Sequence, residues 1–134
     1  SISAIDYINA LDKRNQITAT VSTFFEDVDV VITPTLPILP QRHGVDSVSF
    51  DGETEPIFHA MVRYTSPFNI TGNPALSIPC GIARDLPVGL QLIAPVHRED
   101  LLLRAGYAYE RVALQDYYAE RDKRLGLPND LFCV

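Results

Sequence analysis

The stretch that decides the fold is residues 75–94, ALSIPCGIARDLPVGLQLIA. Two apolar runs, 75–78 and 87–94, flank the segment 81–86, which contains glycine and charged residues. Two such runs around a short polar segment are typical of two strands joined by a turn. Pro95 ends the second run, because proline lacks the N–H that would continue a sheet. We therefore expect an antiparallel hairpin.

A helix is predicted on each side of this hairpin. Ser3 and Asp6 have the spacing of a capping box, and apolar residues then recur at helical spacing to about Phe25. After the hairpin, Glu99 and Asp100 begin a second helical pattern, since acidic residues favour a helix amino terminus. The face of this helix that covers the sheet is expected to carry Leu101, Ala105, Ala108 and Val112.

Two shorter helices are expected before the hairpin, over residues 56–64 and from residue 65 to the Gly-Asn-Pro sequence at 72–74. The chain from residue 117 is charged, and we expect a tail there. Its stop signals are Gly126 and Pro128.

The segment 29–33 is rich in β-branched residues and apolar on both faces, which predicts a buried strand of the kind found in parallel sheets. Prolines at 34, 37 and 40 follow it, and their three-residue spacing suits either a polyproline II ligand of an SH3 domain or a stiff surface loop. The apolar residues between these prolines need burial, which favours the loop. Residues 41–55 are polar with little periodicity and are the candidate for a mobile loop.

Composition limits the classes of protein to consider. The 134 residues are 46% hydrophobic and 21% charged, which predicts a single globular domain, residues 1–134. No apolar run approaches the roughly 20 residues that cross a bilayer, so no membrane association is expected. The net charge is −6 and the basic residues are scattered, which argues against direct nucleic-acid binding. Two cysteines form no disulfide framework, and we expect a cytoplasmic location.

Candidate catalytic groups are few. The three histidines, His43, His59 and His97, are too far apart for a local metal motif, and no metal site or cofactor is predicted. Cys80 follows a strand and is either a nucleophile or a small buried apolar residue, the commoner role of such a cysteine. Arg63 can hold a carboxylate, cap a helix or form a surface ion pair. The two lysines are Lys13 and Lys123, and neither has the context of a buried base.

Two stretches together resemble the carboxy-terminal part of amidase signature enzymes: residues 65–81, TSPFNITGNPALSIPCG, and residues 86–94, LPVGLQLIA. The resemblance extends over residues 1–116 and leaves 117–134 unassigned. It implies an α/β fold, specifically a partial amidase-signature fold in which a fragment of a mixed sheet contains a β-hairpin flanked by helices. Asn69 suits a place where it would satisfy buried backbone groups.

The resemblance also implies a reaction. Amidase signature enzymes cleave carboxylic amides with a serine nucleophile, a second serine held by a cis peptide and a lysine base, all nearer the amino terminus. None of these has a matching position here, so the chain is expected to contain no catalytic residue and to be inactive alone. Thr65 and Phe68 are the implied substrate-binding residues, as walls of the acyl pocket.

The implied partners are the amino-terminal remainder of the amidase and a small amide substrate, and the chain alone is expected to self-associate through an exposed apolar face. Related enzymes that transfer ammonia to aminoacylated transfer RNA often carry an acidic residue shortly before the Asn-x-x-Gly stretch. Residues 61–64 contain none, which favours an amidase with a broader substrate range over a glutamine-specific enzyme. Two alternative hypotheses are a free-standing interaction or regulatory subunit that has the amidase scaffold without its catalytic residues, and a cysteine hydrolase that uses Cys80.

Overall fold

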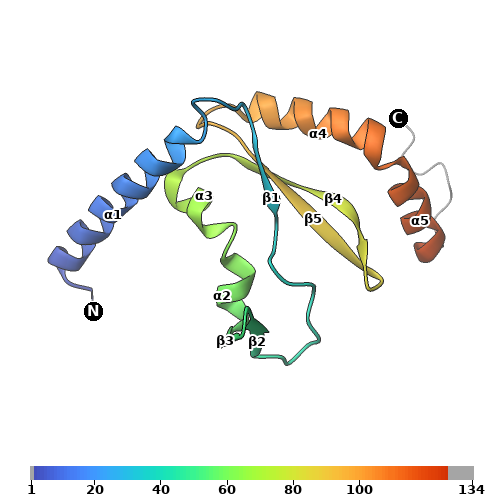
Figure 1. The fold of residues 1–134 in the computed structure, drawn as a ribbon, viewed down its shortest axis with the longest axis horizontal. Coiled ribbons are helices and arrows are strands. Elements are labelled where there is room, and N and C mark those ends of the chain that lie inside the picture. Colours follow the sequence, from blue (N-terminus) through green and yellow to red (C-terminus); the bar gives the residue numbers. More distant parts are fainter. Residues whose placement is uncertain (1, 127–134) are drawn as a thin grey trace.

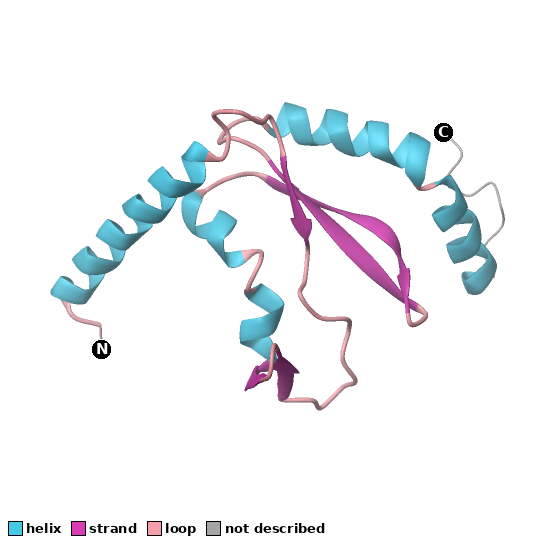
Figure 2. Ribbon diagram, viewed as in Figure 1, coloured by secondary structure: helices cyan, strands magenta, loops and turns pink. Residues whose placement is uncertain are grey.

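The computed structural model describes residues 2–126 and shows a mixed α/β fold (Figures 1 and 2). Its helices and strands in chain order are α1 (Ala4–Thr23), β1 (Val31–Pro34), β2 (Ser47–Phe50), β3 (Glu53–Pro56), α2 (Ile57–Val62), α3 (Ser66–Thr71), β4 (Ala75–Ala83), β5 (Leu86–Ile93), α4 (Glu99–Ala113) and α5 (Gln115–Leu125). None of these helices combines the length and apolar composition needed to cross a membrane.

The expected hairpin is confirmed as β4 and β5, which pair antiparallel from Ala75↔Ile93 to Ala83↔Leu86. The first strand is longer than predicted, because a β-bulge between Pro79 and Gly81 lets it continue past the glycine. The chain reverses instead at residues 84 and 85, which both have positive φ. Such a left-handed pair matches the twist of a tight hairpin.

The third strand corrects one expectation. β1 pairs with β5 in the antiparallel direction, giving the order β1-β5-β4, so it is not a parallel strand. It is also only partly buried, since Ile32 is 60% exposed. The β-branched run shows that the segment is extended, but its neighbour and its direction depend on residues some 60 positions further along the chain.

The sheet has two different faces. On one face, Leu76, Leu90 and Leu92 pack under α4. The helix approaches the sheet closely at Gly106, where an added Cβ would lie 2.6 Å from Leu76 Cδ2. On the other face, Ile93 is fully buried against Val21 of α1 and Phe68 of α3. The strand at the centre of the sheet thus contributes to both apolar clusters.

The first helix is docked only through its carboxy-terminal half. Its predicted capping box is present, with Ser3 Oγ accepting from the Asp6 N–H and the Asp6 carboxylate accepting from the Ser3 N–H. Val21 is its buried residue, and Arg14 Nε donates to the carbonyl of Ile70 at 2.8 Å. The amino-terminal half projects away from the sheet, and Ile5 there is 71% exposed (Figure 1).

The segment 41–55 is not the loop that was expected. It contains β2 and most of β3, a hairpin that turns at Asp51 and Gly52, both with positive φ. The Asp-Gly pair is itself a hairpin signal, although the flanking residues are mostly polar. This small sheet lies apart from the main one, beside α2 (Figure 2).

The carboxy-terminal helices differ from the prediction in two ways. Leu101 and Ala105 of α4 pack against the core as expected, but the buried positions are Leu102 and Gly106. Ala108 and Val112, also expected to face the sheet, are exposed, Val112 to 86%. The charged segment after residue 115 is a helix, α5, which ends at Gly126 in the left-handed conformation. The second stop signal, Pro128, lies outside the described residues.

Candidate functional site

Hydroxyl and amide side chains gather on the face of the sheet opposite α4. We call Thr33, Thr35, Ser77 and Gln91 the polar row. Gln91 is 3% exposed, and its Nε2 donates to Thr33 Oγ1 at 3.1 Å and to the backbone carbonyl of Tyr64 at 3.0 Å. The Thr35 and Ser77 hydroxyl oxygens are 2.8 Å apart. Because the side chains at Thr33, Gln91 and Ser77 are in register across three strands, they point to one side of the sheet.

Gly89 makes room for this row. A Cβ at position 89 would lie 2.8 Å from Thr35 Oγ1 and 3.3 Å from Ser77 Oγ. The backbone of Thr35 also donates to the Gly89 carbonyl at 3.0 Å. A side chain at position 89 would therefore push apart the two hydroxyls that the strands bring together.

The two predicted substrate-binding residues lie at the start of α3, beside the polar row. Thr65 is half-buried, and its Oγ1 donates to the Val62 carbonyl at 3.3 Å. It directly follows Tyr64, whose carbonyl is held by Gln91. Phe68 is 8% exposed, with its ring in the cluster that contains Val21 and Ile93. Contact of either residue with a substrate stays a prediction.

A second polar link fixes the end of α3 to the sheet. Thr71 Oγ1 donates to Asn73 Oδ1 at 2.6 Å, and Asn73 Nδ2 donates to the Ala94 carbonyl at 2.9 Å. Asn73 thus has the role that the sequence interpretation gave to Asn69, which is exposed. The Gly-Asn-Pro sequence could have indicated this, because asparagine after a helix often bonds nearby backbone groups.

The other candidate groups do not join the polar row. Cys80 lies at the β-bulge and is exposed, contrary to the expectation of a buried apolar role, and its Sγ is 3.5 Å from the Val88 carbonyl oxygen. Arg63 forms an ion pair with Glu55. Lys13 and Lys123 are both exposed, on α1 and α5 at opposite ends of the molecule (Figure 1). Within residues 2–126, no group of three or more His, Cys, Asp or Glu side chains could hold a metal ion.

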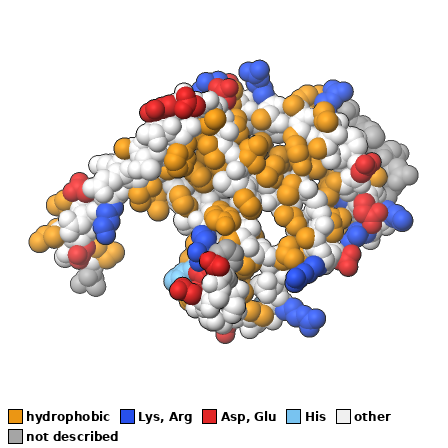
Figure 3. Space-filling view, viewed as in Figure 1, with side chains coloured by type: hydrophobic (Ala, Val, Ile, Leu, Met, Phe, Trp, Pro, Cys, Tyr) orange, Lys and Arg blue, Asp and Glu red, His pale blue; other side chains and the backbone are white. Residues whose placement is uncertain are grey.

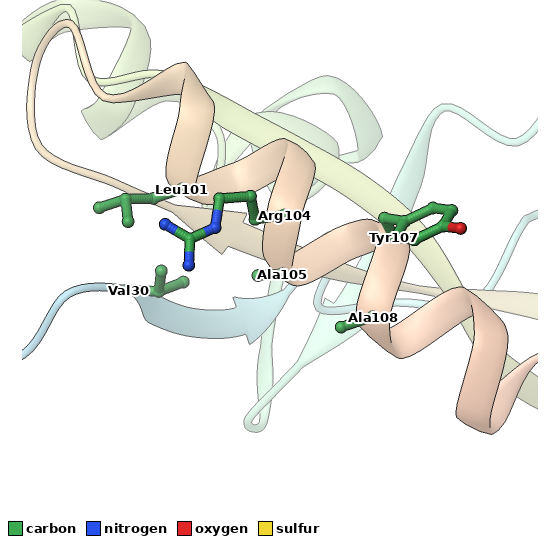
Figure 4. A pocket seen from close by; sticks show the side chains of 6 residues that line it. All are labelled: Val30, Leu101, Arg104, Ala105, Tyr107 and Ala108. Atoms are coloured by element: carbon green, nitrogen blue, oxygen red, sulfur yellow. The ribbon is translucent and has the colours of Figure 1, made fainter.

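Two shallow hollows lie along α4, on the other side of the sheet. The first, of about 510 Å³, is lined by Val30, Leu101, Arg104, Ala105, Tyr107 and Ala108 (Figure 4). Most of its lining is aliphatic, and its polar groups are the Arg104 guanidinium and the Tyr107 hydroxyl. Such a surface suits contact with apolar side chains of another segment better than bond cleavage.

The second hollow, of about 440 Å³, lies between α4, α5 and β4. The Tyr118 hydroxyl there donates to Glu110 Oε1. This hydrogen bond, together with partial burial and the negative charge of Glu110, raises the pKa of Tyr118 to about 12. The phenol therefore stays protonated near neutral pH and holds α5 against α4, so it supplies no base.

Comparisons with known proteins agree with this fold. A family model described as Amidase matches residues 1–103. An amidase of Pseudomonas putida is 39% identical over 114 residues, 82% of this chain and 24% of the relative. A glutamyl-tRNA(Gln) amidotransferase subunit of Clostridium botulinum (strain Eklund 17B / Type B) is 38% identical over 107 residues, 78% of this chain and 21% of the relative. The structure of 6-aminohexanoate cyclic dimer hydrolase complexed with substrate has a TM-score of 0.70 at 28% identity, covering 82% of this chain and 25% of that one.

These matches confirm the resemblance seen in residues 65–81 and 86–94. The family model covers most of the chain, and the solved structure has the same arrangement of helices and strands. The chain spans about a quarter of the length of these relatives. It therefore belongs to the amidase family.

Proposed function

We propose that this chain is the carboxy-terminal scaffold and substrate-pocket portion of a hydrolase that cleaves carboxylic amides, with the serine and lysine residues of the reaction located outside it. One observation carries the proposal. The chain corresponds to about a quarter of its amidase relatives, and this quarter brings together hydroxyl and amide groups, while both lysines are exposed on the helices α1 and α5. The side chains of the polar row form hydrogen bonds to one another and to the Tyr64 carbonyl, and none of them is a group that could take up a proton near neutral pH.

Thr65 and Phe68 are the proposed walls of the acyl pocket. Thr65 stands at the first turn of α3, next to the polar row, and its half-buried position leaves part of the residue accessible. Phe68 packs against Val21 and Ile93 and is only 8% exposed, so little of the residue can reach a substrate. We therefore expect Phe68 to limit the depth of the pocket while it also holds α3 on the core.

The proposed partner is the amino-terminal remainder of the amidase. Figure 3 shows hydrophobic side chains spread over the middle of the molecular face in view. Among the most exposed large apolar residues are Ile5 on α1 and Leu103 on α4, the latter 66% exposed. In the sheet order β1-β5-β4, β1 and β4 each pair with one strand within residues 2–126, so an outer edge of each is available to further chain.

We propose a broad amide substrate class rather than a glutamine-specific one, because residues 61–64, Met-Val-Arg-Tyr, include no acidic side chain that could bind an ammonium or amino group. The amidase and the amidotransferase subunit described above match this chain at similar identity, 39% and 38%, so sequence identity does not separate the two substrate classes. A cytoplasmic location is part of the proposal, on the ground that the cysteines form no disulfide framework.

The complete reading frame of the gene tests this function. We expect a Gly/Ser-rich stretch upstream of Ser1, preceded by a lysine, and we expect the purified product to hydrolyse simple amides. Replacing that lysine with alanine should abolish turnover, because the nucleophile would lose its base. An in-frame start codon immediately before Ser1 would contradict the proposal and would favour a free-standing, non-catalytic subunit.

A further inference from the structure

Gln91 is a buried polar side chain on a strand whose neighbouring residues belong to the apolar core. It lies on the central strand between Leu90 and the fully buried Ile93, and it is itself 3% exposed. Burying an amide without hydrogen bonds is costly, so its partners matter. The two hydrogens of its Nε2 are directed to Thr33 Oγ1 and to the carbonyl of Tyr64. A leucine would fill nearly the same volume, so what the glutamine adds is this pair of directed bonds.

The two bonds differ in what they connect. Thr33 lies on β1, so the first bond joins two strands that are already paired. Tyr64 lies on the connection between α2 and α3, so the second bond fixes that connection to the sheet. The next residue along the chain is Thr65, which stands directly before α3 and donates its backbone N–H to the Val62 carbonyl at 3.2 Å.

We propose that Gln91 is a positioning residue for amide selectivity: by donating to the Tyr64 carbonyl, it sets the position of Thr65 relative to the sheet. The inference rests on the proposed function, because selectivity has meaning only in an enzyme that binds amides. Gln91 does not touch the substrate in this account. It acts through the backbone at residues 64 and 65, and so through the proposed pocket wall.

The test compares two variants in the protein encoded by the complete reading frame. Gln91→Leu removes both hydrogen bonds, and Thr33→Val removes only the bond to β1 at nearly constant volume. Each is measured by the ratio of kcat/KM for acetamide to that for benzamide, and by hydrogen exchange at the Thr65 backbone amide. A third variant, Gln91→Glu, has a carboxylate that cannot donate until it is protonated.

We expect Gln91→Leu to change the substrate ratio by roughly tenfold, since small displacements of a pocket wall have effects of at least this size. Exchange at Thr65 should become faster in the same variant, while Thr33→Val leaves both quantities close to the wild-type values. The ratio for Gln91→Glu should return toward wild type as the pH falls, because the protonated carboxyl regains one donor. Common effects of pH on the enzyme cancel in the ratio.

The inference is overturned if Gln91→Leu and Thr33→Val change the ratio equally, or if neither changes it, since Gln91 would then be a core residue only. A wild-type protein that hydrolyses neither amide would refute the proposed function, and with it the role in selectivity. Exchange at Thr65 would still decide in that case whether Gln91 holds the α2–α3 connection in place.

Discussion

For Phe68, a role in core packing and a role in the substrate pocket predict different effects of substitution. Its ring lies against Val21 and Ile93, so Phe68→Ala should lower the free energy of unfolding by about 3 to 5 kcal/mol through the cavity it leaves. If the ring also limits the pocket, Phe68→Leu should favour bulkier amides by roughly 1 to 3 kcal/mol in kcat/KM. The variants are compared in the full-length enzyme by thermal unfolding and by kinetics on small and bulky amides. Early melting with every substrate ratio unchanged would show that Phe68 is core alone.

The absence of a side chain at Gly89 leaves room for the contact between the Thr35 and Ser77 hydroxyls. The added methyl of Gly89→Ala would meet Thr35 Oγ1 at 2.8 Å, and overpacking of this kind costs about 1 to 3 kcal/mol. Urea unfolding measures the loss. The matched control is the same change in a Thr35→Ala background, where the nearest atom is gone and part of the stability should return. If Gly89→Ala lowers the free energy of unfolding equally in both backgrounds, crowding against Thr35 Oγ1 is not the reason for a glycine at position 89.

At the scale of the helix and strand, local sequence patterns predicted the features that depend on neighbouring residues and missed those that depend on distant contacts. The β4–β5 hairpin, the capping box of α1 and the closure of α3 at Gly72 depend on neighbouring residues, and all three are confirmed. The buried face of α4 was predicted correctly at Leu101 and Ala105 and wrongly at Val112, because periodicity gives the spacing of apolar residues, whereas the approach of Leu76 to Gly106 sets the rotation of the helix.

The polar row could not be predicted, for a related reason. It depends on the register of β1 against β5 and of β5 against β4, which brings Thr33, Gln91 and Ser77 side by side from positions up to 58 residues apart. No local spacing contains that information. Residues 65–81 could still be assigned to a family, because the motif is continuous in the sequence.

The contact between α4 and α5 should depend on pH. The Tyr118 hydroxyl donates to Glu110, and its pKa in the folded protein is raised to about 12 from an ordinary value of about 10. The stability that this bond contributes is therefore complete below pH 10 and is lost as the pH rises toward 12. Tyrosinate absorbance should show a step near pH 12 in the wild-type protein, and Tyr118→Phe should remove that step. Loss of every phenol proton near pH 10 in the folded protein would contradict this.

At the scale of the whole molecule, large apolar side chains are exposed along two helices. Ile5, Leu103 and Val112 are all more than half exposed, and they lie on α1 and α4. We expect the isolated chain to self-associate through these faces, because water contact with large apolar side chains is unfavourable. Sedimentation at increasing concentration checks this, with Ile5→Glu together with Leu103→Glu expected to shift the distribution toward monomer. A strict monomer at high concentration would contradict the expectation.

The measurement that tests the central claim most directly is amide hydrolysis by two proteins: the 134-residue chain alone, and the product of its complete reading frame. We predict turnover of simple amides by the complete product and none by the isolated chain, because Lys13 and Lys123 are both exposed and neither has the buried setting of a catalytic base. Hydrolysis by the isolated chain that disappears when one of its own residues is replaced, such as Cys80→Ser, would contradict the account.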